Sequence, residues 1–400
     1  MSDPLTGFKG RGALSPVAPA WMNDEVFPAA PRDASFGQFG FRGYKTLAAA
    51  KLARIVRQAS TDIASLMWTP DSVRVLPVWD QPEFRTDAWS ASRRLWVLVT
   101  IMTAVYCCFL AKDMQWDLRN RVSASDLLTL LTWSIAGAFC CWQLSRVLRK
   151  SGGYFEAARA WHRFNAWTRL RAGYWTEGFV LGLLAVFFCE AYFGSHSDAD
   201  DGKVVLVKKL AFSFESVVSR DQWWRILTGV VVHNGPPHVF GNILELLFLS
   251  RWLNGLGPRA LVPLVIGIGA WSGALVSMLV FDPMPGMGLS AGVCALEGFI
   301  IVTWLRTHTT PPYLGPFLLL FAVRGVIDNI LVDTNMQTAG HIGGYFAGVF
   351  LGSAFVQPDA HLPIKIGRQV EIAGEIAAMV LIATCIGVSF NLSGAAWAQW

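Results

Sequence analysis

The chain has 400 residues, of which 53% are hydrophobic and only 15% are charged, and its formal net charge is +5. Soluble globular domains carry about 25% charged residues, so this composition excludes an ordinary soluble protein and a disordered one. The 18 Trp and 26 Phe residues favour a protein in contact with lipid, because aromatic side chains collect at membrane interfaces. No basic run alternates with aromatic residues, so we expect no nucleic-acid partner.

The first 94 residues lack a long apolar run, and we expect a partly irregular region there. Residues 1–40 are rich in Pro and Gly and lack the apolar core of a secretory signal peptide. Residues 44–60 are basic and have the pattern of an amphipathic helix on a membrane surface.

Nine later segments are predicted to cross a membrane, because each approaches the roughly 20 apolar residues that a spanning helix needs. We therefore predict an all-α integral membrane protein. Basic residues are more frequent in alternate connections, so the positive-inside rule places the N-terminus on the inner side. The predicted spans are 95–111, 126–147, 176–194, 238–254, 259–280, 289–305, 313–332, 339–356 and 371–391.

The first two spans have a short connection and are expected to form an antiparallel hairpin over residues 95–147. Residues 148–175, which follow, suit a helix on an anionic inner leaflet, with a solvated linker as the alternative. Three Trp residues support the interfacial position. The basic residues of this segment are Arg149, Lys150, Arg159, Arg163, Arg169 and Arg171.

Four ionisable residues fall inside predicted spans, where a charge is costly and usually has a partner. Arg324 and Asp328 are four residues apart, so we expect them to pair on one helix face. Glu297 is expected either to pair with Arg324 or to pack as a protonated acid, and Glu245 is the fourth.

Gly288, Ser290 and Gly292 form a GxSxG pattern at the start of the sixth span. Glycine permits a tight approach at a helix start, and a helix N-terminus favours a developing negative charge. Small residues around a serine also serve helix packing in membranes, so the pattern alone does not decide between the two.

Three histidines stand at the predicted outer ends of the fourth and eighth spans. His341 heads the eighth span, which carries a small-residue stripe at Gly344, Gly348 and Gly352. His238 and Asn242 are four apart on one face of the fourth span, after His233, and both can donate to an oxyanion. Zinc binding is the competing interpretation of the histidines, although no fourth ligand has suitable spacing.

Together these segments resemble the rhomboid family of intramembrane serine proteases, over about residues 176–356. The family pattern is matched by Trp224-Arg225, by His233, His238 and Asn242, by Gly257-Pro258-Arg259, by Asp282-Pro283 before GLSAGVCAL, and by the GHxxGxxxG run of Gly340, His341, Gly344 and Gly348.

The resemblance implies that Ser290 is the nucleophile and His341 the general base, without metal or cofactor. It also implies that His238, Asn242 and the Ser290 backbone N–H stabilise the oxyanion. Substrates would be transmembrane segments in the lipid bilayer. Trp224, Arg225, His233, Gly288, Gly344 and Gly348 would have supporting roles.

The chain departs from the family pattern in its two extra N-terminal spans, in the acids Glu245 and Glu297, which are unusual inside the core, and at two further positions. Ala291 stands where glycine usually follows the nucleophile and is expected to add a methyl group beside the oxyanion site, and Asn254 replaces a common acid. Two alternatives therefore stay open: a catalytically inactive rhomboid-like scaffold, and a channel or transporter. The host membrane, secretory or mitochondrial inner, stays open.

We accordingly divide the chain into five parts. These are an N-terminal inner-side region (1–94), an extra hairpin that offers a surface for membrane-complex partners (95–147), a basic interfacial linker (148–175), a rhomboid core (176–356) and a C-terminal helix and tail (357–400).

Overall fold

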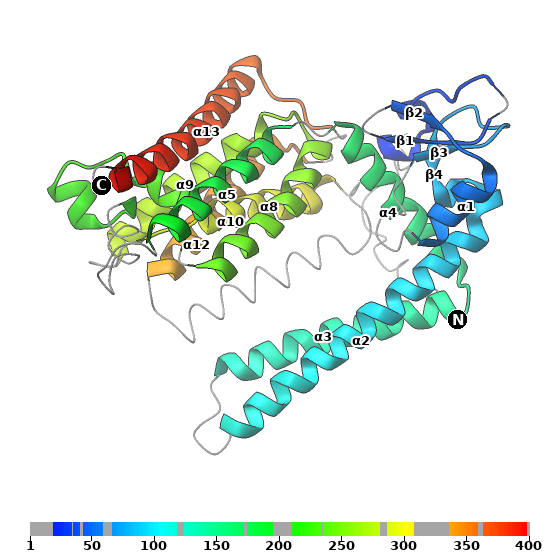
Figure 1. Ribbon diagram of the computed structural model, residues 1–400, viewed down its shortest axis with the longest axis horizontal. Helices are drawn as coiled ribbons and strands as arrows, with labels where there is room; N and C mark the ends of the chain where they lie inside the picture. The colour runs from blue at the N-terminus through cyan, green and yellow to red at the C-terminus, as the bar shows by residue number, and fades with distance from the viewer. Residues whose placement is uncertain are drawn as a thin grey trace.

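The structure is a computed structural model with three visible parts: a helical bundle, a long two-helix hairpin and a small α+β unit (Figure 1). It describes residues 19–33, 35–40, 43–58, 66–117, 124–171, 174–194, 210–233, 235–280, 286–307, 336–358 and 363–397. The predicted span 313–332, with Arg324 and Asp328, lies outside the described residues.

The bundle is built from the most apolar segments of the chain. Helices α9, α10 and α12 pack against one another, α8 contacts α5, α9 and α10, and α13 lies across α5 and α9 (Figure 1). The bounds are α5 Trp175–Gly194, α8 Pro236–Leu256, α9 Leu261–Val280, α10 Ser290–Thr307, α12 Met336–Phe355 and α13 Arg368–Trp397.

Four of the described helices are long and apolar enough to cross a membrane, namely α5 over Trp175–Tyr192, α9 over Leu261–Val280, α10 over Ser290–Thr307 and α13 over Arg368–Asn391. The prediction of a helical membrane protein is thereby confirmed. The predicted spans 95–111, 126–147 and 238–254 fall within α2, α3 and α8, and the span 339–356 overlaps α12, which ends one residue earlier.

The hairpin consists of α2 (Arg85–Asp117) and α3 (Ala124–Leu148), which pack along each other. Helix α2 begins ten residues before its predicted apolar span, because its first turns bury Ala88 and Ala91 in the α+β unit. One continuous helix therefore leads from that unit into the hairpin, which extends away from it (Figure 1).

The α+β unit, called here the N-terminal unit, is formed by the described residues between 19 and 91. Its four-stranded antiparallel sheet has the order β2-β1-β3-β4 and covers a core that includes Met67, Trp79 and Leu52. The sheet is an addition to the predicted all-α architecture. Its elements are η1 Ala20–Met22, η2 Asp24–Val26, β1 Gly37–Gly40, β2 Gly43–Thr46, α1 Ala49–Gln58, β3 Leu66–Trp68, β4 Leu76–Pro77, η3 Val78–Asp80 and η4 Pro82–Phe84.

The segment predicted as an interfacial linker is largely a helix, α4 (Gly152–Arg171), that packs between the N-terminal unit and the bundle. Arg163 on α4 is fully buried and pairs with Asp24 at 2.6 Å and with Asp80 at 3.0 Å. Arg159 also reaches Asp80, at 2.6 Å. Two of the six basic side chains expected on a leaflet thus pair with acids of the N-terminal unit, and one of them, Arg163, is buried there.

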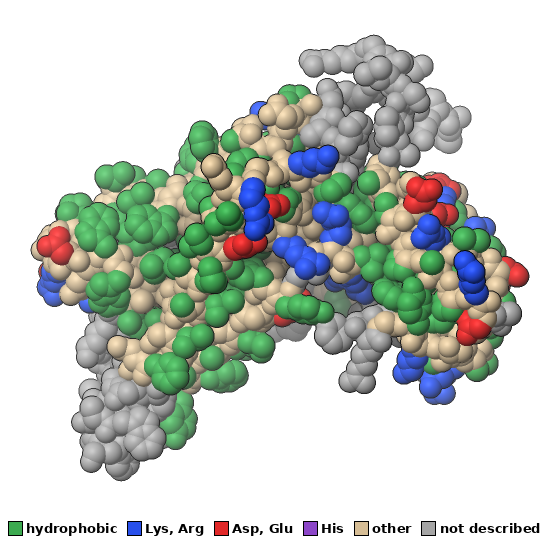
Figure 2. Space-filling view, turned by 90° about the horizontal axis from the view of Figure 1, so that it is seen from above, with side chains coloured by type: hydrophobic (Ala, Val, Ile, Leu, Met, Phe, Trp, Pro, Cys, Tyr) green, Lys and Arg blue, Asp and Glu red, His purple; other side chains and the backbone are tan. Residues whose placement is uncertain are grey.

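Helix α4 touches the bundle near the C-terminal end of α8, where the rings of Trp161 and Trp252 meet edge to face at 5.5 Å. Figure 2 shows hydrophobic side chains over much of the bundle and Lys and Arg gathered at the waist between bundle and N-terminal unit. The N-terminal ends of α8, α10 and α12 lie at the opposite end of the bundle (Figure 1).

Candidate active site

Ser290 is the first residue of α10 and follows an extended segment that is anchored on an earlier loop. Gly286 and Phe212 exchange both backbone hydrogen bonds, at 2.6 and 3.1 Å, and the Gly288 N–H donates to the Gly229 carbonyl at 2.8 Å. Gly288 has φ +102°, a left-handed conformation that favours glycine. This segment fixes where α10 begins and hence the depth of the Ser290 hydroxyl.

His341 lies on α12, at the head of the predicted glycine stripe. A Cβ added at Gly344 would collide with the backbone carbonyl of Ala291, and one at Gly348 with that of Ala295. The stripe therefore permits the close approach of α12 to α10. At this separation His341 Nε2 lies 2.7 Å from Ser290 Oγ, a hydrogen-bond distance.

His238 and Asn242 approach the same point from α8. A Cβ added at Gly288 would lie 2.6 Å from His238 Cε1 and 3.6 Å from Asn242 Nδ2. Asn242 is 6% exposed, and its Nδ2 has no hydrogen-bond partner among the described residues. A buried donor without an acceptor is costly, so this amide is placed to bind an oxygen that is supplied from outside.

His233 supports this arrangement from behind. It is 2% exposed, its Nδ1 lies 3.1 Å from the Val231 carbonyl oxygen, and its ring packs edge to face against His238 at 5.1 Å. Burial, with a smaller contribution from His238, lowers the pKa of His233 to about 4. His233 is therefore neutral near pH 7, with Nδ1–H donating to the carbonyl.

Trp224 and Arg225 lie in the loop that anchors the serine segment, at the start of α7 (Arg225–Val231), which follows η5 (Glu215–Ser219). The Arg225 guanidinium stacks over the Trp224 ring at 5.1 Å and donates to the Ala211 carbonyl at 3.2 Å. Ala211 adjoins Phe212, which pairs with Gly286. The Trp-Arg pair is thus connected to the segment before Ser290 through backbone hydrogen bonds.

Ala291 does not occupy the place expected for it. Its methyl group faces Gly273 on α9, where an added Cβ would overlap it. The expectation of a methyl group beside the oxyanion site is therefore wrong, because the first turn of α10 directs that side chain toward α9, whereas His238 and Asn242 lie on α8.

A polar contact next to the site was missed from the sequence. The Tyr345 hydroxyl, one turn after His341, donates to the carboxyl group of Glu297, which is 4% exposed. Glu245 of α8 adjoins the same carboxyl group. The signal was available, since Tyr345 is four residues after His341 and Glu297 seven after Ser290, on the helix faces that carry those residues.

Residues 220–358, which include all four site residues, match the family model described as the rhomboid domain. This part of the chain is thus a rhomboid domain. Similar rhomboid proteins include rhomboid protease GluP of Bacillus subtilis, 28% identical over 182 residues, and Rhomboid-related protein 2 of Mus musculus, 30% identical over 146 residues. RHOMBOID-like protein 1 of Arabidopsis thaliana is 27% identical over 156 residues.

The likeness is confined to part of each rhomboid protein. The three alignments cover 43%, 33% and 38% of this chain and 32%, 48% and 40% of the respective relatives. The chain thus spans about a third to a half of the length of these curated relatives. In the described part of the chain, no group of three His, Cys, Asp or Glu residues is placed to hold a metal ion.

Proposed function

We propose that this rhomboid protein is an intramembrane serine protease with Ser290 as nucleophile and His341 as general base. The observation that carries the proposal is the 2.7 Å contact between Ser290 Oγ of α10 and His341 Nε2 of α12. Glycines on α12 permit the close approach of these two helices. A serine hydroxyl is a weak nucleophile until an adjacent base takes its proton, and this geometry supplies the base.

The proposed reaction runs in two stages. In the first stage His341 Nε2 takes the Ser290 proton as Oγ attacks the scissile carbonyl carbon, and His341 then protonates the leaving amine as the C–N bond breaks. In the second stage His341 takes a proton from water, which attacks the acyl-enzyme. The Ser290 Oγ–acyl bond breaks and the proton returns to Oγ.

The negative oxygen formed in both stages would lie beside Gly288, between α8 and the start of α10. The Asn242 amide and the His238 ring face that position, and the N-terminus of α10 favours negative charge there. An oxyanion would thus provide the acceptor that Asn242 Nδ2 lacks among the described residues.

We further propose that the substrates are transmembrane segments. The site lies at the N-terminal ends of three bundle helices, and apolar side chains surround the bundle on the face shown in Figure 2. An unwound substrate segment has backbone groups that need partners in lipid, and the polar site residues would provide them.

The test is labelling of the purified full chain with a fluorophosphonate, which reacts with activated serines. We expect labelling that disappears in Ser290→Ala and falls strongly in His341→Ala. Ser277→Ala is the matched control, because Ser277 is a buried serine on the adjacent α9, 2% exposed, and should leave labelling intact. A folded chain that does not label would contradict the proposal.

An inactive rhomboid-like scaffold is the second candidate. The hairpin favours it, because α2 exposes Leu98, Ile101 and Met102, each of which is 54–61% exposed. A lipid-facing or partner-facing surface of this kind suits a subunit of a membrane complex. A well-folded, unlabelled chain that co-purifies with a membrane protein through α2 would favour this function.

A further inference from the structure

A small group of polar side chains lies one to two helical turns from the proposed dyad, where α8, α10 and α12 meet. It consists of Glu245 on α8, Glu297 on α10 and Tyr345 on α12, and it is called here the polar cluster. The Tyr345 hydroxyl donates to the Glu297 carboxyl group, which Glu245 adjoins. Each of the three helices that carry the proposed catalytic residues thus contributes one member.

Two members of the polar cluster lie on the helix faces that carry the proposed dyad. Tyr345 is four residues after His341 on α12, and Glu297 is seven residues after Ser290 on α10. At 1.5 Å per residue, the two members lie about 6 Å and about 10 Å along their helices from the dyad. A rotation of either helix that breaks the contact between Tyr345 and Glu297 would therefore also move His341 relative to Ser290.

The glycine contacts bring α10 and α12 together but do not fix their rotation. An added Cβ at Gly298 would lie 2.7 Å from the Tyr345 carbonyl oxygen, so the two backbones are in close contact there. Van der Waals contact tolerates small rotations, because each atom pair contributes little, whereas a hydrogen bond requires a narrow range of distance and angle. The bond between Tyr345 and Glu297 therefore adds a directional restraint that glycine packing lacks.

Stability alone does not account for the polar cluster. Glu297 is 4% exposed, and a buried acid in a membrane helix is costly. Well-packed apolar side chains of similar volume often stabilise a protein as well as buried polar groups do, or better. What a directional polar contact adds is the selection of one helix arrangement among those that apolar packing would allow.

We propose that Tyr345 and Glu297 are positioning residues for the protease reaction, an inference that rests on the function proposed above. Their hydrogen bond holds α12 at the rotation that keeps His341 Nε2 within reach of Ser290 Oγ. Glu245 extends the restraint to α8, the helix that carries the proposed oxyanion donors. Tyr345 and Glu297 do not touch the reacting atoms and act through His341.

A second contact between the same two helices provides an internal control. Arg306, near the C-terminal end of α10, donates to the Ser353 and Val356 carbonyls, each at 2.7 Å. It is sixteen residues after Ser290, or about 24 Å along the helix. This contact should also hold α10 and α12 together, but it is too distant to set the position of a side chain at the dyad.

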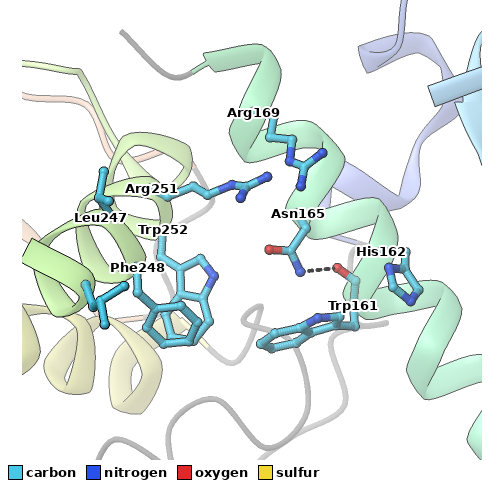
Figure 3. Close-up of a pocket in the computed structure, with 9 residues that line it drawn as sticks. Trp161, His162, Asn165, Arg169, Leu247, Phe248, Arg251 and Trp252 are labelled. Carbon is cyan, nitrogen blue, oxygen red and sulfur yellow. Dashed lines mark hydrogen bonds between the residues drawn. The ribbon is translucent and has the colours of Figure 1, made fainter. Parts of the chain in front are cut away.

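A hydrogen bond within one helix provides a second control. In the crevice between α4 and α8, the Asn165 amide donates to the Trp161 carbonyl of its own helix at 2.9 Å (Figure 3). This crevice lies at the end of the bundle away from Ser290. Loss of the Asn165 bond should therefore leave the dyad unchanged.

The experiment is fluorophosphonate labelling of Ser290 in the purified full chain over a range of probe concentrations. Such a series separates the maximal labelling rate from the probe concentration that gives half of that rate. A base misplaced by 1 Å can cost about 100-fold in rate, so Tyr345→Phe, which allows a smaller shift, should lower the maximal rate about ten-fold and leave the half-saturating concentration unchanged. Arg306→Gln and Asn165→Ala should keep the parent rate, although Arg306→Gln should lower the unfolding temperature.

Variants of Glu297 test whether the hydrogen bond itself is required. Glu297→Gln keeps an acceptor oxygen in nearly the same volume and should retain most of the rate, whereas Glu297→Leu should slow labelling as much as Tyr345→Phe does. Because both changes remove the same bond, Tyr345→Phe/Glu297→Leu should be no slower than either single variant. Glu245→Leu should also lower the maximal rate, because the restraint on α8 is lost.

Thermal unfolding checks that each variant is folded, and if Tyr345→Phe is not, the comparison of Glu297→Gln with Glu297→Leu carries the test. Parent-like labelling by folded Tyr345→Phe, equal rates for the two Glu297 variants, or an equal loss of rate in Arg306→Gln would each overturn the inference while the proposed function stands. A folded parent chain that does not label would overturn both.

Discussion

The residues proposed to carry the reaction all lie near helix N-termini. Ser290 opens α10, His238 is the third residue of α8, and His341 is the sixth residue of α12. The first turn of a helix has unpaired N–H groups and the positive end of the helix dipole. The first turn of α10 lies where a negative oxygen would form, so its backbone N–H groups are proposed to contribute to the site as well as the four side chains.

Asn242→Ala is predicted to lower kcat by about 100- to 1,000-fold and to change KM little. The amide has no acceptor among the described residues, so its hydrogen bond would form only with the oxyanion, and one such donor typically contributes about 3 kcal/mol. Cleavage kinetics on a transmembrane substrate give both constants.

The control for this substitution is Asn254→Ala, which removes a buried amide near the other end of α8, where Asn254 is 5% exposed. Both variants should lose some thermal stability, but only Asn242→Ala should lose kcat. A raised KM with unchanged kcat would instead assign Asn242 to substrate binding.

His233 is predicted to make stability depend on pH below about 6.5. Burial holds the pKa of its ring at about 4 in the folded chain, whereas the ring titrates near 6.5 when unfolded. The unfolded chain therefore binds the extra proton first. The stabilisation is complete above pH 6.5 and falls by on the order of 3 kcal/mol as the pH approaches 4.

The measurement is the unfolding temperature from pH 7.5 to 4.5 for the parent chain and for His233→Gln, which keeps an amide donor for the Val231 carbonyl. The parent chain should lose stability more steeply on acidification than the variant. Parallel curves would show that His233 does not titrate differently in the two states.

Helix positions followed well from hydropathy where a helix is apolar throughout. The spans predicted at 259–280 and 289–305 are found as α9 (Leu261–Val280) and α10 (Ser290–Thr307). The prediction was less accurate for α2, since its polar first turns pack in the N-terminal unit and hydropathy does not register them. The glycine stripe was readable because small residues at every fourth position mark one helix face.

Gly344→Ala is predicted to impair both stability and activity. The added methyl group would overlap the Ala291 carbonyl, and overpacking of this kind costs about 1–3 kcal/mol. Relief by a shift of α12 would lengthen the Ser290–His341 contact. We expect a lower unfolding temperature and at least ten-fold slower fluorophosphonate labelling.

Gly387→Ala on α13 is the control, because an added Cβ there would meet nothing within 4 Å. Alanine is the better helix former by about 1 kcal/mol, so this variant should be as stable as the parent or more so. Equal labelling rates for both variants would show that the glycine stripe does not set the geometry of the site.

At the scale of the whole molecule, the N-terminal unit and the bundle share α4. The packing of α4 on the N-terminal unit could not be predicted from the sequence. It depends on ion pairs of Arg163 with Asp24 and Asp80, which lie more than 80 residues earlier in the chain. The strands also escaped prediction, since they have two to four residues and are too short for an alternating pattern. The sequence pattern instead placed residues 1–147 in parts distinct from the rhomboid core of residues 176–356.

The structure predicts that a chain beginning at residue 150 will be unstable. Such a chain lacks Trp21, whose ring packs against Phe164 at 5.8 Å, and it lacks both acidic partners of Arg163. Phe164 is 0% exposed and Trp167 is 4% exposed in the full chain, and both side chains would become more exposed to solvent. Burial of each such side chain contributes roughly 1.5–3 kcal/mol, so α4 would lose several kcal/mol of stabilisation.

Because α4 runs almost directly into α5 and packs on α8, this loss should reach the bundle. We expect the shortened chain to aggregate or to unfold at a clearly lower temperature, with reduced labelling at Ser290. A chain beginning at residue 19 is the control, because it keeps every contact named here and should match the full chain. If the chain beginning at residue 150 instead unfolds and labels like the full chain, the N-terminal unit is dispensable for the bundle, and its contacts with α4 serve another purpose.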